Sequence, residues 1–265
     1  MTLRALCAVG GALLLLSSNA SAQTLEKRVA AAPDGSVRFS FAAKPGVYGN
    51  GRNVISWGCD DGDCHNRQVD NYDDHDDWNT PCDSGPVRVA LTKRNGAIAD
   101  LRVYVGGQWR VGDATDLGSV GARDAANFLL GLAKQDASRA AEKAIFAAML
   151  ADSVTLWPDL LKIAREADIS RKVRRSAVFW LGQAAGDAAT RGLTELVDDR
   201  GTDREVRESA VFALSQRPRD EGVPALIRIA KENPDPELRR KAIFWLGQSD
   251  DPRALSLFEE LLTRP

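Results

Sequence analysis

The sequence has little of the material from which most catalytic sites are built. Only two histidines and four cysteines occur in 265 residues, and aromatic residues make up 6%. It contains no Gly-x-Ser-x-Gly motif, no phosphate-binding loop and no dinucleotide fingerprint. Neither sign of charge dominates, since 35 basic residues stand against 37 acidic ones, so nothing draws the whole chain to nucleic acid. We therefore expect a non-enzymatic protein that binds no nucleic acid.

The sequence also lacks an apolar run long enough to cross a membrane. Its longest apolar segment lies at the N-terminus. The stretch from Ala5 to Leu16 falls short of the roughly 20 apolar residues that a membrane span needs. Arg4 precedes it, and Ala20-Ser21-Ala22 follows as a small-x-small cleavage site. Residues 1–22 are therefore predicted to be a signal peptide. The mature protein is expected to be periplasmic or secreted, with no membrane span after cleavage.

Residues 23–115 carry the pattern of a small antiparallel β domain. The segment Val37–Phe41 alternates apolar and polar residues with a period of two, as does Val87–Leu91. Asn95-Gly96 then predicts a hairpin turn. The return strand is expected over Ile98–Val105, with its apolar residues on one face.

From about residue 121 the pattern becomes helical and repeats. Three similar segments begin at Val173, Val206 and Leu238, at spacings of 33 and then 32 residues, and a weaker copy covers residues 140–150. A second apolar helix precedes each copy, as Pro158–Ala164 and Pro224–Ala230 show. A period near 33 with paired helices predicts an α-solenoid. Residues 121–265 should form about four helix pairs and a closing helix.

The repeated motif [Val/Leu]-Arg-x-x-Ala-[Val/Ile]-Phe-[Trp/Ala]-Leu resembles HEAT repeats, in particular the short bacterial, phycobilisome-lyase-like variety. The resemblance covers residues 121–265 and implies a mainly α fold, a HEAT-like α-α superhelix (solenoid), with a binding or scaffolding role. It also implies a structural ladder of an Asp at the turn and an Arg on the second helix, here Asp203 with Arg207 and Asp235 with Arg239. Both aspartates are also suited to cap the helix that follows.

The segment from Trp57 to Asp83 gathers both histidines and the three cysteines that remain after signal cleavage. Because exported cysteines usually pair, we expect one disulfide among Cys59, Cys64 and Cys82. Closure by Cys59 with Cys82 is weakly favoured over Cys59 with Cys64, and the sequence leaves the connectivity open.

The same segment suggests a metal site as an alternative to a solvated acidic loop. Calcium prefers clustered carboxylate oxygens, and the candidate ligands are Asp70, Asp73, Asp74 and Asp76. The order of residues is not that of an EF-hand loop. Zinc is a weaker candidate, because Cys-x4-Cys-His is not a standard zinc spacing. No cofactor is expected other than this candidate calcium ion.

Five residues of the second helices are candidates for partner binding. Trp180 and Trp245 share a repeat position that is alanine in the other copies, which suggests packing between repeats or, on an open face, binding anchors. Arg175, Glu208 and Arg240 share another position with alternating charge. The mixed charge suits a protein partner better than nucleic acid.

The hypothesis is an exported protein-binding scaffold. The alternative is a calcium- or zinc-binding or enzymatic head domain mounted on a structural solenoid.

Overall fold

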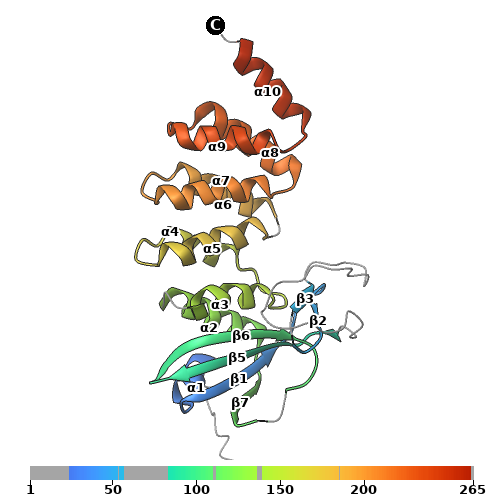
Figure 1. Ribbon diagram of the computed structural model, residues 1–265, viewed down its shortest axis with the longest axis vertical. Coiled ribbons are helices and arrows are strands. Elements are labelled where there is room, and N and C mark those ends of the chain that lie inside the picture. The colour runs from blue at the N-terminus through green and yellow to red at the C-terminus, as the bar shows by residue number, and fades with distance from the viewer. Residues whose placement is uncertain are drawn as a thin grey trace, which may run out of the picture.

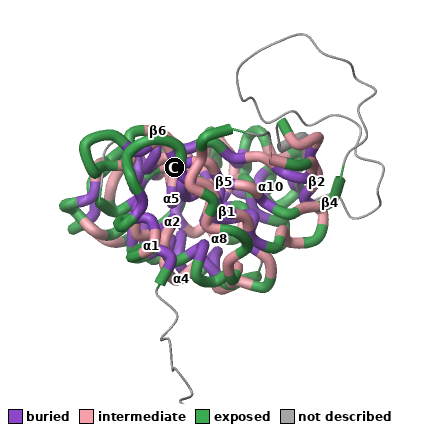
Figure 2. Tube along the Cα trace, turned by 90° about the horizontal axis from the view of Figure 1, so that it is seen from below, coloured by how far each residue is buried: buried purple, intermediate pink, exposed green. Residues whose placement is uncertain are grey.

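The computed structural model describes residues 24–52, 54–56, 83–109, 112–135, 139–184 and 186–263. Within these ranges a β region forms one end of an elongated molecule, and helix pairs stack above it toward the C-terminus (Figure 1). Buried residues lie along the inside of this stack (Figure 2). The fold is thus the predicted α-solenoid with a small N-terminal β region.

The main sheet has the strand order β6-β5-β1-β7. Strands β1 (Gly35–Phe41), β5 (Val87–Arg94) and β6 (Ala97–Val105) pair antiparallel, which confirms the predicted strands. A further strand, β7 (Ala114–Ser119), pairs parallel with β1 at the other edge. It was not predicted, because Ala-Thr-Asp-Leu-Gly-Ser carries little apolar alternation and no residue of it is buried.

The hairpin between β5 and β6 turns at Asn95-Gly96, as predicted. Both residues have positive φ, 52° at Asn95 and 76° at Gly96, which is the backbone that an Asn-Gly turn favours. The carboxylate of Asp34 accepts hydrogen bonds from both amides, at 2.6 Å from Asn95 and 3.0 Å from Gly96. The turn is therefore tied to the start of β1.

One face of the sheet is buried against the first helices along β1, β5 and the second half of β6. Alternate residues of β1, β5 and β6 point inward, and Phe39 contacts Phe128 of helix α2 (Ala122–Gln135) edge-to-face at 5.8 Å between ring centroids. Two backbone hydrogen bonds join the chain after β1 to the end of helix α3 (Arg139–Met149), from Lys44 N to Leu150 O and from Asp152 N to Ala42 O. The sheet and the first helix pair therefore share one core.

A smaller sheet of order β3-β2-β4 lies beside the main one. It is formed by β2 (Tyr48–Gly49), β3 (Val54–Ser56) and β4 (Asp83–Ser84). It flanks the segment that contains the predicted disulfide and metal residues.

Helices make up the rest of the described chain. A short helix α1 precedes the sheet, and α2 to α9 form consecutive pairs, with α10 last. Their bounds are α1 Leu25–Ala31, α2 Ala122–Gln135, α3 Arg139–Met149, α4 Trp157–Arg165, α5 Arg171–Gly182, α6 Asp187–Asp198, α7 Arg204–Ser215, α8 Arg219–Glu232, α9 Pro236–Leu246 and α10 Pro252–Thr263.

The helix pairs are arranged in two layers. The second helices α3, α5, α7 and α9 pack against one another in that order, and the first helices α4, α6 and α8, followed by α10, form the other layer. Within the described residues no helix is long and apolar enough to cross a membrane.

A buried arginine joins successive pairs at the α7–α8 turn. Arg217 donates to the Thr190 hydroxyl at 2.8 Å and to the carbonyls of Gly182 and Gly186 at 3.1 and 2.9 Å. It also bonds the Glu221 carboxylate at 2.9 Å. The hydrogen bond from Thr190, followed by that from Arg217, lowers the pKa of Glu221. A single side chain thus connects α5, α6 and α8.

Helix α1 was not predicted, and its end is fixed by Lys93 of β5. The Lys93 ammonium, which is buried, donates to the carbonyls of Val29, Ala30 and Ala32 at 3.2, 2.6 and 2.6 Å. These carbonyls lie at the C-terminal end of α1, where a helix cannot supply a full set of intrahelical donors. No local pattern indicates this contact, because 61 residues or more separate the partners.

Replacing Lys93 should therefore destabilise the β region. We expect Lys93→Met to lower the free energy of unfolding by about 1–3 kcal/mol, because buried carbonyls lose their donor. Urea denaturation measures the change. Arg94→Met is the matched control, since Arg94 is the exposed neighbour in the same strand. A loss no larger than that of the control would contradict the prediction.

The start of α10 is held by an acid-sensitive contact. Hydrogen bonds from the side chain and then the backbone N–H of Arg253 lower the pKa of Asp251 to about 2. The Arg253 guanidinium also reaches the Arg219 carbonyl at 2.9 Å. Because the folded pKa lies below the ordinary value of 3.8, this contact stabilises the fold above pH 3.8 and loses its effect as the pH falls toward 2.

Asp251→Asn should remove that part of the acid response. In the unsubstituted chain, amide protection of α10 should fall between about pH 4 and 2, whereas in the variant it should already be low at neutral pH and change less. Hydrogen exchange across this pH range measures it. Asp250→Asn is the control, because asparagine tolerates the positive φ of 48° at that position. Equal pH profiles for Asp251→Asn and the unsubstituted chain would refute the assignment.

Candidate functional site

The five predicted binding residues lie on the second helices. Arg175 and Trp180 are on α5, Glu208 is on α7, and Arg240 and Trp245 are on α9. We call the surface that these helices share with α3 the second-helix face. It is defined by a row of phenylalanines and a row of charged residues at equivalent repeat positions: Phe146, Phe179, Phe212 and Phe244, and Glu142, Arg175, Glu208 and Arg240.

Both tryptophans lie at contacts between successive repeats. Trp180 contacts Phe146 of the preceding repeat at 5.4 Å between ring centroids, and Trp245 contacts Phe212 at 5.0 Å. Each is partly buried against the core. The structure thus gives them a packing position beside the open surface, and their rings support the phenylalanine row.

The phenylalanines are the more exposed aromatics, and sequence reasoning did not single them out. Phe179 is 42% exposed and Phe244 is 57% exposed. Each makes an edge-to-face contact with the tryptophan that follows it in its own helix, at 5.0 Å. A signal was present, because phenylalanine occupies this position in all four copies of the motif. Periodicity alone could not tell which of the two aromatic positions faces solvent.

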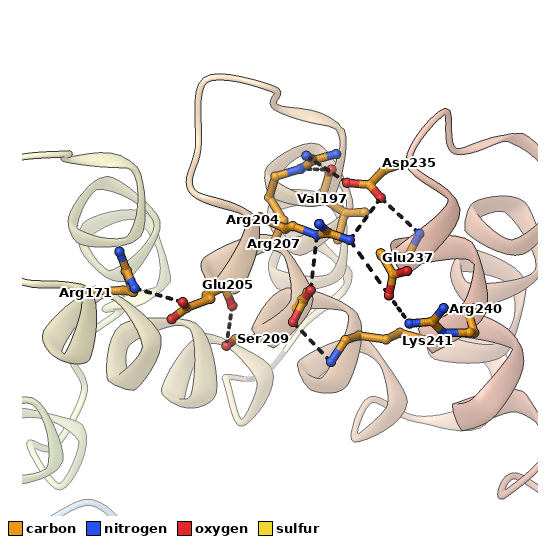
Figure 3. A network of polar contacts seen from close by, with 11 residues as sticks. Arg171, Val197, Arg204, Glu205, Arg207, Ser209, Asp235, Glu237, Arg240 and Lys241 are labelled. Carbon is orange, nitrogen blue, oxygen red and sulfur yellow. Dashed lines mark hydrogen bonds and ion pairs between the residues drawn. The ribbon is translucent and has the colours of Figure 1, made fainter.

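The charged row differs from one repeat to the next. Glu208 is paired with Arg204 at 3.4 Å and with Lys241 at 3.1 Å. Arg240 is paired with Glu237, and Arg204 lies 3.8 Å from the same carboxylate. Figure 3 shows this network between α7 and α9. Within the part of the chain that the structure describes, Arg175 forms no ion pair and is exposed.

A hollow of about 580 Å³ opens beside Arg175, between α3, α5 and α7. Its walls contain the aromatic side chains Phe179 and Phe212 and several polar ones. The polar residues are Glu142, Arg171, Lys172, Arg175, Ser176 and Ser209. Of the residues predicted for partner binding, only Arg175 lines it.

The Asp–Arg ladder exists, but it joins successive repeats. Arg174 is paired with Asp203 of the next repeat, and Arg207 lies 3.6 Å from Asp235 of the repeat after that. The expected pair of Asp203 with Arg207 is not formed within the described residues, since Asp203 meets Arg174 and Arg207 lies near Asp235. Arg207 does not reach Asp203 because its side chain extends the other way. Its guanidinium donates to Val197 O at 2.9 Å and lies near Asp235 in the following turn.

The other expected pair, Asp235 with Arg239, is not formed in the described part of the chain either, because both side chains bond backbone groups. Arg239 donates to the carbonyls of Asn233 and Pro234 at 2.7 and 3.2 Å, instead of pairing with Asp235. The Asp235 carboxylate caps α9 by accepting from Glu237 N at 3.0 Å, as predicted. The predicted cap at Asp203 is wrong, since its carboxylate makes no capping bond and instead meets Arg174.

Several predicted residues lie outside the described ranges. These are the signal segment 1–22, the cysteines Cys59, Cys64 and Cys82, and the calcium candidates Asp70, Asp73, Asp74 and Asp76. Among the residues that are described, no group of three or more His, Cys, Asp or Glu side chains could hold a metal ion. The disulfide and the calcium site therefore stay predictions.

The β region contributes a second cluster, which sequence reasoning missed. On the sheet face away from the helices, the guanidinium carbons of Arg38 and Arg88 lie 5.1 and 5.4 Å from the ring of Trp109. Burial, and then the nearby charge of Arg38, lowers the pKa of Arg88. The donors of Arg88 are used by the carbonyls of Gly106 and Gly107. The cluster therefore fixes Trp109 to the sheet.

Loss of the ladder residue Asp203 should destabilise the protein more than loss of the surface residue Asp187. Asp203→Ala should lower the free energy of unfolding by about 1–3 kcal/mol, because the buried Arg174 guanidinium would lose its carboxylate partner. Asp187→Ala should cost about 0.5 kcal/mol or less, since its pair with Arg191 is exposed on both sides. Thermal or urea unfolding compares the two. Equal effects would show that the ladder contributes no more than a surface pair.

The comparisons with known proteins agree with this arrangement. Residues 191–265, which include α7 to α10, match the family of HEAT repeats. No curated protein matches the chain. The matched segment contains two of the three strong motif copies and the Arg207–Asp235 contact between them. The match thus covers the C-terminal part of the helical stack, and the paired helices that precede it fit the same kind of repeat.

Proposed function

We propose that this protein is a non-enzymatic scaffold that binds another protein on its second-helix face. The observation that carries the proposal is the phenylalanine row, of which Phe179 and Phe244 are 42% and 57% exposed, beside the charged row. Aromatic and arginine side chains are the residues that most often dominate protein interfaces. HEAT repeats generally serve as protein-interaction scaffolds, which is consistent with this role.

The rigidity of the stack favours such a role. The tryptophans and the ladder fix the second helices against one another, so the exposed phenylalanines are held in place before a partner arrives. A surface that is ordered in advance loses little conformational entropy on binding. Affinity can then come from a few well-placed side chains.

The first-helix layer offers less to a partner. Many of its cations are already used in ion pairs between neighbouring helices, as Arg165 with Glu195 at 3.0 Å and Arg228 with Asp198 at 2.8 Å. Such pairs connect successive repeats on the surface. The second-helix face, in contrast, presents exposed rings and the unpaired Arg175 within the described residues.

We further propose that the partner is met outside the cytoplasm. The support is the segment Arg4 to Ala22, with its short apolar run and small-x-small end. The repeated motif also supports placing these HEAT repeats in the short bacterial variety. Neither point names the partner.

Affinity capture with matched variants tests the binding face. The full chain and the variant Arg175→Glu/Arg240→Glu serve as parallel baits for proteins of the exported fraction. The control is Arg191→Glu/Arg200→Glu, which reverses two exposed charges on α6 and in the turn after it. We expect at least one partner to be kept by the control and lost from the second-helix variant, because opposite charge becomes like charge. Capture that is the same with all three baits would refute the proposal.

A further inference from the structure

The α5–α7 step of the second-helix face differs from the steps on either side. At the other two steps a tryptophan covers the phenylalanine of the preceding repeat, as Trp180 covers Phe146 and Trp245 covers Phe212. At the α5–α7 step the same position is Ala213. No ring of α7 therefore covers Phe179 in the described structure, and the hollow of about 580 Å³ opens there.

The close approach of α5 and α7 explains the alanine. A Cβ placed on Gly182 would lie 3.0 Å from the Ala213 Cβ and 3.3 Å from its backbone. Ala213 is itself buried, at 2% exposure. A large side chain cannot enter this contact without separating the helices. The small pair Gly182 and Ala213 thus leaves Phe179 without a covering tryptophan, and Phe179 is 42% exposed.

The charges around the hollow are unbalanced. Lys172 is paired with Glu142 at 2.6 Å, and Arg171 is paired with Glu205 of α7 at 2.8 Å. The third cation, Arg175, has no partner within the described residues, and the Ser176 hydroxyl beside it makes no hydrogen bond there. The wall therefore carries one surplus guanidinium next to an exposed aromatic ring.

We propose that the α5–α7 hollow binds a peptide segment of a partner protein in which an apolar side chain stands next to a carboxylate. The apolar side chain packs on Phe179 and Phe212, and the carboxylate accepts hydrogen bonds from Arg175. A guanidinium is suited to this role because its fork of donors matches the two oxygens of a carboxylate. This inference rests on the proposed function and names the chemistry of its partner.

The charge pattern favours this occupant over nucleic acid. Binding of a phosphate backbone depends on several cations that each neutralise a phosphate. Here Arg171 and Lys172 are already neutralised by carboxylates of the protein, and only Arg175 is left over. One surplus positive charge beside two phenylalanines complements a single acidic residue with an apolar neighbour.

A phage-displayed library of random 12-residue peptides, selected on the full chain, tests the proposal. Selected sequences should place Asp or Glu within two positions of a large apolar residue. Synthetic copies, labelled with fluorescein, should bind about tenfold more weakly to Arg175→Glu, because reversal replaces an attraction by a repulsion. Phe179→Ala should also weaken them. Selection on Arg175→Glu should enrich Lys or Arg in place of the acid.

Arg240→Glu and Phe244→Ala are the matched controls, because they change the same two positions in the last repeat, where Arg240 is already paired with Glu237. They should leave the affinity within about twofold, as expected for surface changes remote from a contact. Circular dichroism shows that all four variants keep their fold.

The outcomes separate this inference from the proposed function. Peptides that depend on Arg240 and Phe244 instead of Arg175 and Phe179 would overturn the α5–α7 site but leave the second-helix face as the binding surface. Peptides insensitive to all four variants would count against both. Selected sequences without an acid, a preference for labelled oligonucleotides, or a library that yields no binder would each overturn the present inference, while the capture experiment decides the proposed function independently.

Discussion

The structure depends on contacts between successive repeats, because buried charged groups of one helix pair find partners in the neighbouring pair. Three buried guanidinium groups show this dependence. Arg174 is paired with Asp203, Arg207 with Asp235, and Arg217 bonds groups of α5, α6 and α8. A buried charged group that loses a partly exposed partner costs about 1–3 kcal/mol. Removing one repeat would therefore leave charged groups unpaired in its neighbours, in addition to exposing their apolar surface. This is why stability in such stacks is largely a property of the interfaces between repeats.

At the N-terminal end of the stack, the β region supplies the contacts that the first helix pair needs on its outer side. The buried face of the sheet packs on the first helix pair through Phe39 and Phe128, and backbone hydrogen bonds tie the chain after β1 to the end of α3. Lys143 of α3 also reaches Asp100 of β6 at 3.0 Å. The sheet thus covers apolar surface of the first pair that a preceding repeat would otherwise cover. In this sense the β region acts as a cap, whatever further role its other face has.

The same inter-repeat packing shapes the binding surface. Where a tryptophan fits between repeats, as at Trp180 and Trp245, it covers the preceding phenylalanine and the face is filled. Where α5 and α7 approach closely through Gly182 and Ala213, the face is hollowed and Phe179 stays exposed. A packing constraint inside the stack thereby determines where side chains of a partner can enter. The ion pairs on either side determine which cation, Arg175, is left to meet a charge.

The sequence by itself determined the repeat, the helix pairs, the strands Val37–Phe41 and Val87–Leu91 and the Asn95-Gly96 turn, since periodicity and turn chemistry are local properties of the chain. It also identified Asp203, Arg207 and Asp235 of the ladder and Arg175, Glu208 and Arg240 of the charged row. It missed α1, β7, the direction of the ladder and the exposed phenylalanines. Each of these depends on partners far apart in sequence, such as Lys93 with the end of α1 and Arg174 with Asp203. Only the tertiary structure decided them, because the side-chain direction and the spacing between repeats arise when the helices pack.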